Sequence, residues 1–164
     1  MRQEEMLSSH TVKRFFKKYM GTRYKLYCKV LLELFVWRLN IVNPGSIVLD
    51  MDTMVLDNDD ARKREGVSVT FKNRKGYQPI QISWEGMIVN AYFGRGNAHS
   101  NHGIDVKTII KEIVQLIRRR YSRDVPIMVT SDSGFMDEDN FEHFENELKI
   151  HYICYGKQYE TVKS

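Results

Sequence analysis

The chain has 164 residues, which is about the size of one domain with a single hydrophobic core. Its 42% hydrophobic and 28% charged residues, with only 3 prolines, exclude a disordered or low-complexity protein. The net charge of +4 permits nucleic-acid binding without requiring it. The longest apolar stretch, residues 30–39, is too short to cross a bilayer, and the N-terminus lacks the apolar core of a signal peptide, so we expect a cytoplasmic protein with no membrane partner.

The first 45 residues are predicted to form a helical segment. Ser8 or Ser9 can cap a helix over residues 11–20, which Gly21 ends. A second helix is predicted from Thr22 to about Asn40, because apolar residues recur at spacings of three and four, typical of a helix packed on a core. These residues are Tyr24, Tyr27, Leu31, Leu34, Phe35 and Leu39, and both Trp37 and Trp84 are interpreted as core residues. Residues 43–45, Asn-Pro-Gly, then break the chain.

Two apolar runs far apart in the sequence each end in aspartate. Residues 46–53 contain Asp50 and Asp52, and residues 126–135 contain Asp132; each run has the Ile, Val and Met content of a buried strand. If the two strands are neighbours in one sheet, about 4.8 Å apart, their carboxylates can share metal ions about 3.5–4 Å apart. The pattern therefore indicates a two-metal site for phosphoryl transfer.

The polar segment of residues 57–76 is predicted to be a charged excursion from the sheet, most simply a surface loop. Because contacts to phosphates need clustered cations, it is also the better candidate for contacting DNA. The basic residues concerned are Arg62, Lys63, Arg64, Lys72, Arg74 and Lys75. A hairpin is predicted next, with strands over residues 79–84 and 87–93 around Glu85 and Gly86.

The second half of the chain is predicted to alternate helices and strands. An isoleucine- and valine-rich stripe over residues 109–117 indicates a helix that ends at the three arginines of residues 118–120. After the strand that leads to Asp132, a helix is predicted over residues 137–149 and a last strand over residues 150–155. The element order after Gly45 is therefore β-β-β-α-β-α-β, an α/β protein preceded by two helices, with its first three strands as an antiparallel meander.

Several short stretches resemble, in order along the chain, the DDE transposases of bacterial insertion sequences, whose catalytic domain has a ribonuclease-H-like fold. These stretches are residues 49–53 (Leu-Asp-Met-Asp-Thr), 76–79 (Gly-Tyr-Gln-Pro), 96–100 (Gly-Asn-Ala-His-Ser) with Gly103, and 131–135 (Ser-Asp-Ser-Gly-Phe). Upstream, residues 9–15 resemble the segment before the catalytic core in the same proteins. The resemblance implies a mixed five-stranded sheet in which the first and fourth strands are neighbours.

The resemblance also assigns roles to the aspartates. The family's first catalytic aspartate precedes Thr, which corresponds to Asp52, and its second opens the Asp-Ser-Gly-Phe turn, which corresponds to Asp132. It implies that both hold Mg²⁺ or Mn²⁺ ions for cleavage and transfer of DNA strands. Asp50 points to the same face as Asp52 and is expected to be a supporting or alternative metal ligand. The implied partner is DNA at transposon ends. Whether the full-length protein forms a homodimer is left open.

The family's third carboxylate is a Glu on a helix well beyond the strand that ends here at Tyr155, whereas this sequence stops at Ser164. We therefore expect residues 1–45 to be an N-terminal helical segment and residues 46–164 a partial ribonuclease-H-like catalytic domain, inactive alone. Three functions remain open: a transposase core, an inactive transposase remnant, and a ribonuclease-H-like nuclease or nucleic-acid-binding module with its own third carboxylate.

Overall fold

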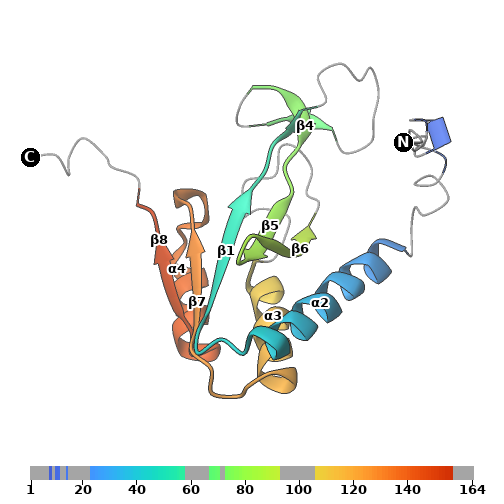
Figure 1. Cartoon of the computed structure of the whole chain (residues 1–164). Helices are drawn as coiled ribbons and strands as arrows, with labels where there is room; N and C mark the ends of the chain where they lie inside the picture. Colours follow the sequence, from blue (N-terminus) through green and yellow to red (C-terminus); the bar gives the residue numbers. More distant parts are fainter. Residues whose placement is uncertain are drawn as a thin grey trace, which may run out of the picture.

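The computed structural model describes residues 8, 10–11, 14, 23–57, 67–70, 73–92 and 106–156. Its centre is a five-stranded mixed sheet with the order β6-β5-β1-β7-β8 (Figure 1). The strands are β1 (Ile47–Thr53), β5 (Ile80–Trp84), β6 (Met87–Tyr92), β7 (Ile127–Ser131) and β8 (His151–Cys154). Strand β1 pairs antiparallel with β5 and parallel with β7. The predicted mixed sheet of ribonuclease-H-like order is thus confirmed, including the neighbouring positions of its first and fourth strands.

The predicted hairpin is confirmed as the pair β5 and β6. Its turn consists of Glu85 and Gly86, with φ angles of 49° and 72°. Two consecutive residues with positive φ are typical of the type I′ turn, whose twist matches that of the flanking strands. A register shift between Ile82 and Ser83 interrupts the regular pairing of the two strands.

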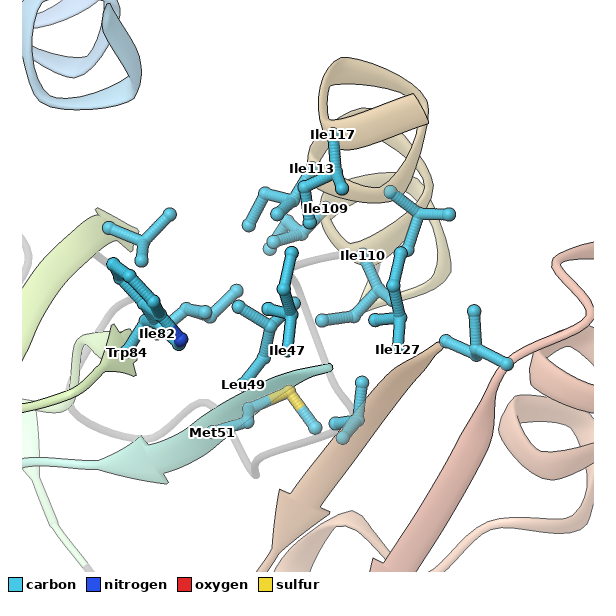
Figure 2. Packing of buried hydrophobic residues seen from close by; sticks show 14 of the residues in the cluster. Ile47, Leu49, Met51, Ile82, Trp84, Ile109, Ile110, Ile113, Ile117 and Ile127 are labelled. Atoms are coloured by element: carbon cyan, nitrogen blue, oxygen red, sulfur yellow. The ribbon is translucent and has the colours of Figure 1, made fainter. Parts of the chain in front are cut away.

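Helix α3 (Val106–Arg120) covers one face of the sheet and builds the core with it. The predicted apolar stripe of this helix is fully buried, in agreement with the 3.6-residue period of its sequence. Figure 2 shows its isoleucines above the inward residues Ile47, Leu49 and Met51 of β1. Because side chains alternate along a strand, these three residues point into the core and their neighbours point to the opposite face.

Helix α2 (Arg23–Val42) packs on the same side, where it contacts β6 and α3. Phe35 meets Trp84 edge-on, with ring centroids 5.7 Å apart, so Trp84 is the core residue that we predicted. The prediction was wrong for Tyr27, Leu34 and Trp37, which are exposed. The helix is apolar on more than one side, and the spacing of its apolar residues does not tell which side faces the core.

Only the start of the predicted N-terminal helix falls on described residues. Ser8 Oγ accepts a hydrogen bond from the Thr11 amide at 3.3 Å, as expected of a capping serine, and His10, Thr11 and Arg14 are helical. The rest of that prediction, and the division of the chain at residue 45, stay predictions.

Part of the segment predicted as a surface loop forms a second, small sheet, so that prediction was wrong for these residues. The strands β2 (Leu56–Asp57), β3 (Ser68–Val69) and β4 (Lys75–Tyr77) pair antiparallel in the order β2-β4-β3. A side chain at Gly76 would overlap the carbonyl oxygen of Leu56, so glycine is needed for this pairing. Residues 58–66 and 71–72 lie outside the described residues.

The predicted helix over residues 137–149 is divided. Asp137 caps α4 (Glu138–Glu142), and a π-helical turn, η2 (His143–Glu147), follows it directly. The segment still packs on the helix-covered face of the sheet, where Phe141 stacks on Tyr152 of β8 at 4.3 Å. No helix in the described ranges is long and apolar enough to cross a membrane.

Candidate functional site

The predicted site lies at the carboxyl end of β1, on the face of the sheet opposite α3. Leu49 and Met51 point into the core, so Asp50 and Asp52 both point away from it and are exposed. The apolar face of the strand anchors it in the core, and the face with the two aspartates is left accessible to a ligand.

Strand β7 brings Asp132 to the same place. The parallel register joins Ile47 to Ile127 and continues to Met51 opposite Ser131. In each chain segment the next residue is an aspartate, so Asp52 and Asp132 directly follow the pair of Met51 and Ser131, and both are exposed. The predicted adjacency of the two aspartate-tipped strands is confirmed, while the catalytic role of the residues stays a prediction.

Asp132 is held by a short turn that begins directly after β7. Its Oδ1 accepts a hydrogen bond from the Gly134 amide at 2.9 Å, which caps the 3₁₀ turn η1 (Ser133–Phe135). Phe135 is buried and anchors this turn in the core. From β8, the thiol of Cys154 donates to the Asp132 carbonyl oxygen at 3.2 Å. The backbone at Asp132 is therefore fixed from two sides.

The two aspartates of β1 have different partners. Asp52 Oδ1 accepts from the Thr53 amide at 2.7 Å, whereas Asp50 Oδ1 accepts from the Thr130 hydroxyl of β7 at 2.8 Å. Thr130, which was not among the predicted site residues, thus links Asp50 by a hydrogen bond to the strand that leads to Asp132. Its position two residues before Asp132, on the same face of the strand, was the signal that could have identified it.

The donor set at this edge fits a hard divalent cation. Asp52 and Asp132 offer only carboxylate oxygens, which Mg²⁺ and Mn²⁺ prefer, and each has one oxygen committed to a nearby backbone amide. In the described part of the chain, no group of three or more His, Cys, Asp or Glu side chains is arranged to hold a metal ion. The two aspartates therefore fit as part of a metal site, and the assignment of Asp50 as a ligand stays a prediction.

Two of the six basic residues predicted to contact DNA are described. Both are exposed: Lys75 is the first residue of β4, and Arg74 directly precedes it. The small sheet extends beyond the carboxyl end of β1 (Figure 1). The other four, Arg62, Lys63, Arg64 and Lys72, lie outside the described residues, as do residues 96–103 of the resemblance.

A second polar site, which the sequence did not indicate, lies between α3 and the segment formed by α4 and η2. It is a pocket of about 270 Å³ lined by Lys107, Asp139, Glu142, His143, Asn146 and Glu147. His143 is only 8% exposed, and its Nδ1 lies 3.1 Å from Glu147 Oε1. This hydrogen bond lowers the pKa of Glu147 below its usual value. Lys107 and Lys111 pair with Asp139 and Glu147, so most charges around this pocket compensate one another.

Comparisons with known proteins found one family and one solved structure that are similar to this chain. The family described as Transposase DDE domain group 1 matches residues 1–163. No curated protein matches the chain significantly. A cryo-EM structure of a piggyBac transposase synaptic complex with hairpin DNA is similar at 13% sequence identity and a TM-score of 0.49. The match covers 96% of this chain and 33% of that one, so this chain spans about a third of that transposase, and the TM-score is too low to carry over its properties. Since the family matches nearly the whole sequence, this chain belongs to the transposase DDE domains of group 1.

Proposed function

We propose that this chain carries part of a metal-dependent site for DNA transposition, in which Asp52 and Asp132 are the catalytic, metal-binding carboxylates. The observation that carries the proposal is the parallel pairing of β1 and β7, whose register leads both aspartates to one exposed edge. Membership of a transposase family supports the same function.

The proposed chemistry is cleavage and transfer of DNA strands. When bound, divalent ions at such a site activate water or a 3′-hydroxyl group and stabilise the leaving oxygen. The chain supplies the negative oxygen ligands and holds them at a defined separation, because each aspartate ends a strand that is fixed by the core. Asp50 adds a third negative charge, held against β7 by Thr130, as a supporting or alternative ligand.

The proposed partner is DNA at transposon ends. Arg74 and Lys75, together with Arg62, Lys63, Arg64 and Lys72, would contact its phosphates. A homodimer of the full-length protein, a bacterial insertion sequence as its source and a cytoplasmic location belong to the same proposal.

Metal binding can be tested with one pair of matched variants. Asp132 and Asp137 each cap a short helix through a carboxylate oxygen, and Asn is an equally good cap. We expect millimolar Mn²⁺ to raise the melting temperature of the wild type, because a ligand that binds only the folded state stabilises it. Asp132→Asn should melt higher than the wild type without metal, since it relieves repulsion among the carboxylates, and should lose the metal response. Asp137→Asn should keep the response.

The same variants, placed in the full-length transposase, connect metal binding to function. Asp132→Asn is expected to abolish cleavage of DNA that carries the transposon ends, and Asp137→Asn to retain it. A wild-type melting temperature that is indifferent to metal, combined with a destabilised Asp132→Asn, would mean that Asp132 is a structural cap and not a ligand.

A further inference from the structure

Helix α2 carries a row of exposed apolar side chains on the side that faces away from the core. We call this row the outer stripe; its members are Leu26, Tyr27, Val30, Leu34, Trp37 and Ile41, which are between 48% and 64% exposed. With 3.6 residues per turn, all six fall within about 100° of one another around the helix axis. The buried residues Phe35, Val36 and Leu39 lie on the opposite side. The helix is therefore apolar on two sides, and the described residues cover only one.

The spacing within the outer stripe indicates what kind of element fits it. From Tyr27 to Ile41, its residues follow one another at alternating intervals of three and four. This pattern keeps a narrow row of side chains in contact along a second helix. The water-facing side of a surface helix is normally polar, and a contiguous exposed apolar patch marks a contact surface. The expected occupant is thus another helix.

The charges beside the outer stripe make it complementary to itself. Glu33 lies on one flank of the stripe and Arg38 on the other. If two copies of α2 pair in parallel, opposite flanks meet, and Glu33 of each copy lies beside Arg38 of the other. Both side chains are already held near the flanks, because Glu33 pairs with Arg120 and Arg38 lies 5.6 Å from the ring centre of Trp84. An antiparallel pair would place each flank beside its own equivalent and lose this match.

The position and size of the outer stripe also suit a pair of identical chains. A two-fold interface uses the same surface on both copies. The stripe lies opposite the buried side of α2, so the two cores would lie on the outer sides of the helix pair, and the first turns of α2 extend beyond the sheet (Figure 1). Because an aromatic side chain alone can bury about 150–250 Å², six half-exposed side chains can bury on the order of 600 Å² per copy. A stable interface buries about 800 Å² per partner, so the stripe supplies most of one.

We propose that the outer stripe joins two copies of this chain through parallel pairing of their α2 helices, with Val30, Leu34 and Trp37 at the centre of the contact. The dimer does not depend on the metal site or on catalysis. It can therefore fail while the metal response that depends on Asp132 is present, and the reverse.

Sedimentation velocity of the full chain over a range of concentrations tests the dimer. We expect the wild type to form a dimer that dissociates on dilution in the micromolar range, as an interface of this size allows. Leu34→Glu should weaken the dimer about tenfold or more, because it would bury a charge in an apolar contact. The matched control is Ile153→Glu, which changes a similarly exposed residue in β8, at the far edge of the sheet from β6 and α2. This variant should associate like the wild type.

The fluorescence of the wild type gives a second measurement that needs no substitution. Trp37 is exposed in the single chain and becomes covered in the dimer, whereas Trp84 is buried in both states. We expect the tryptophan emission to move to shorter wavelengths as the protein concentration rises. The midpoint of this change should agree with the midpoint found by sedimentation.

A cysteine in the outer stripe tests the parallel arrangement. In a parallel pair, position 30 of one helix lies opposite position 30 of the other, so Val30→Cys should form a disulfide between two copies when an oxidant is added. The wild type, which contains Cys28 and Cys154, gives the background level. Val69→Cys, at an exposed position of β3, is the control and should stay at that level.

Three results would overturn the proposal. A wild type that stays monomeric, with an emission that does not depend on concentration, would mean that no second copy covers the stripe. Equal weakening by Leu34→Glu and Ile153→Glu would mean that the dimer does not use the stripe specifically. A dimer in which Val30→Cys forms no more disulfide than the wild type would exclude the parallel pairing.

Discussion

At the scale of single residues, the site depends on the alternation of side chains along β1. Leu49 and Met51 are held in the core, and this forces Asp50 and Asp52 to the accessible face. A shift of one residue in register would exchange the two sets and bury the carboxylates, which is strongly unfavourable. The apolar residues of the strand therefore contribute to the site by fixing which side chains reach it.

Thr130 is predicted to stabilise the pairing of β1 with β7 through its hydrogen bond to Asp50. Thr130→Val keeps the shape and the β-branched side chain but removes the hydroxyl, so it should lower the free energy of unfolding in urea by about 1 kcal/mol. Thr53→Val is the control, because Thr53 donates to Asp52 through its backbone amide, which valine retains. Equal stability of Thr130→Val and the wild type would show that the exposed hydrogen bond contributes nothing.

At the scale of elements, the buried side chains Phe35, Val36 and Leu39 attach α2 to the rest of the domain, and an ion pair adds to this contact. Arg120 Nη1, at the end of α3, donates to Glu33 Oε1 at 2.6 Å. The hydrogen bond and the charge of Arg120 lower the pKa of Glu33 from its ordinary value of 4.5 and raise the pKa of Arg120. Both groups are exposed, so we expect salt to weaken the pair.

The depressed pKa of Glu33 predicts how this attachment depends on pH. A carboxyl group whose pKa is lower in the folded state stabilises the fold at pH values above its unfolded pKa, here 4.5, and this contribution is lost as the pH falls through the folded pKa. Glu33→Gln should therefore lower the urea midpoint at pH 7, and the difference from the wild type should vanish in acid. Glu112→Gln changes an exposed carboxylate on α3 and should have the same urea midpoint as the wild type at both pH values. An equally lowered midpoint of Glu112→Gln at pH 7 would argue against a specific pair of Glu33 and Arg120.

At the scale of the whole molecule, the basic and acidic groups of the proposed site lie at one end of the sheet. The small sheet, with Lys75 in β4 and Arg74 directly before it, extends beyond the carboxyl end of β1. Residues 118–120, in contrast, end α3 where the chain turns toward the start of β7 (Figure 1). A DNA strand held by the small sheet would therefore have its phosphates near Asp52 and Asp132.

This arrangement predicts which cations matter for DNA binding. Arg74→Gln/Lys75→Gln should weaken binding of the full chain to duplex DNA and reduce the dependence of log K on log salt concentration by up to about 2, since each phosphate contact contributes about 0.9. Arg118→Gln/Arg119→Gln removes the same charge at the other end of the sheet and should change the slope less. Equal effects of the two double variants would indicate binding that depends on net charge alone.

The sequence alone was sufficient for the hairpin, the stripe of α3 and the two aspartate-tipped strands, because each of these depends on local periodicity or turn chemistry. The order of the strands in the sheet was expected from the resemblance to DDE transposases and not from the residues themselves. It was not sufficient for the orientation of α2, where Tyr27, Leu34 and Trp37 are exposed although their spacing suits a core. Nor did it indicate the partnership of Thr130 with Asp50, the small sheet or the π-helical turn. These features depend on contacts between residues that are far apart in the sequence. Apolar periodicity indicates that one side of a helix is buried, but which side it is, and against which element it packs, is decided by the neighbouring elements in the folded protein.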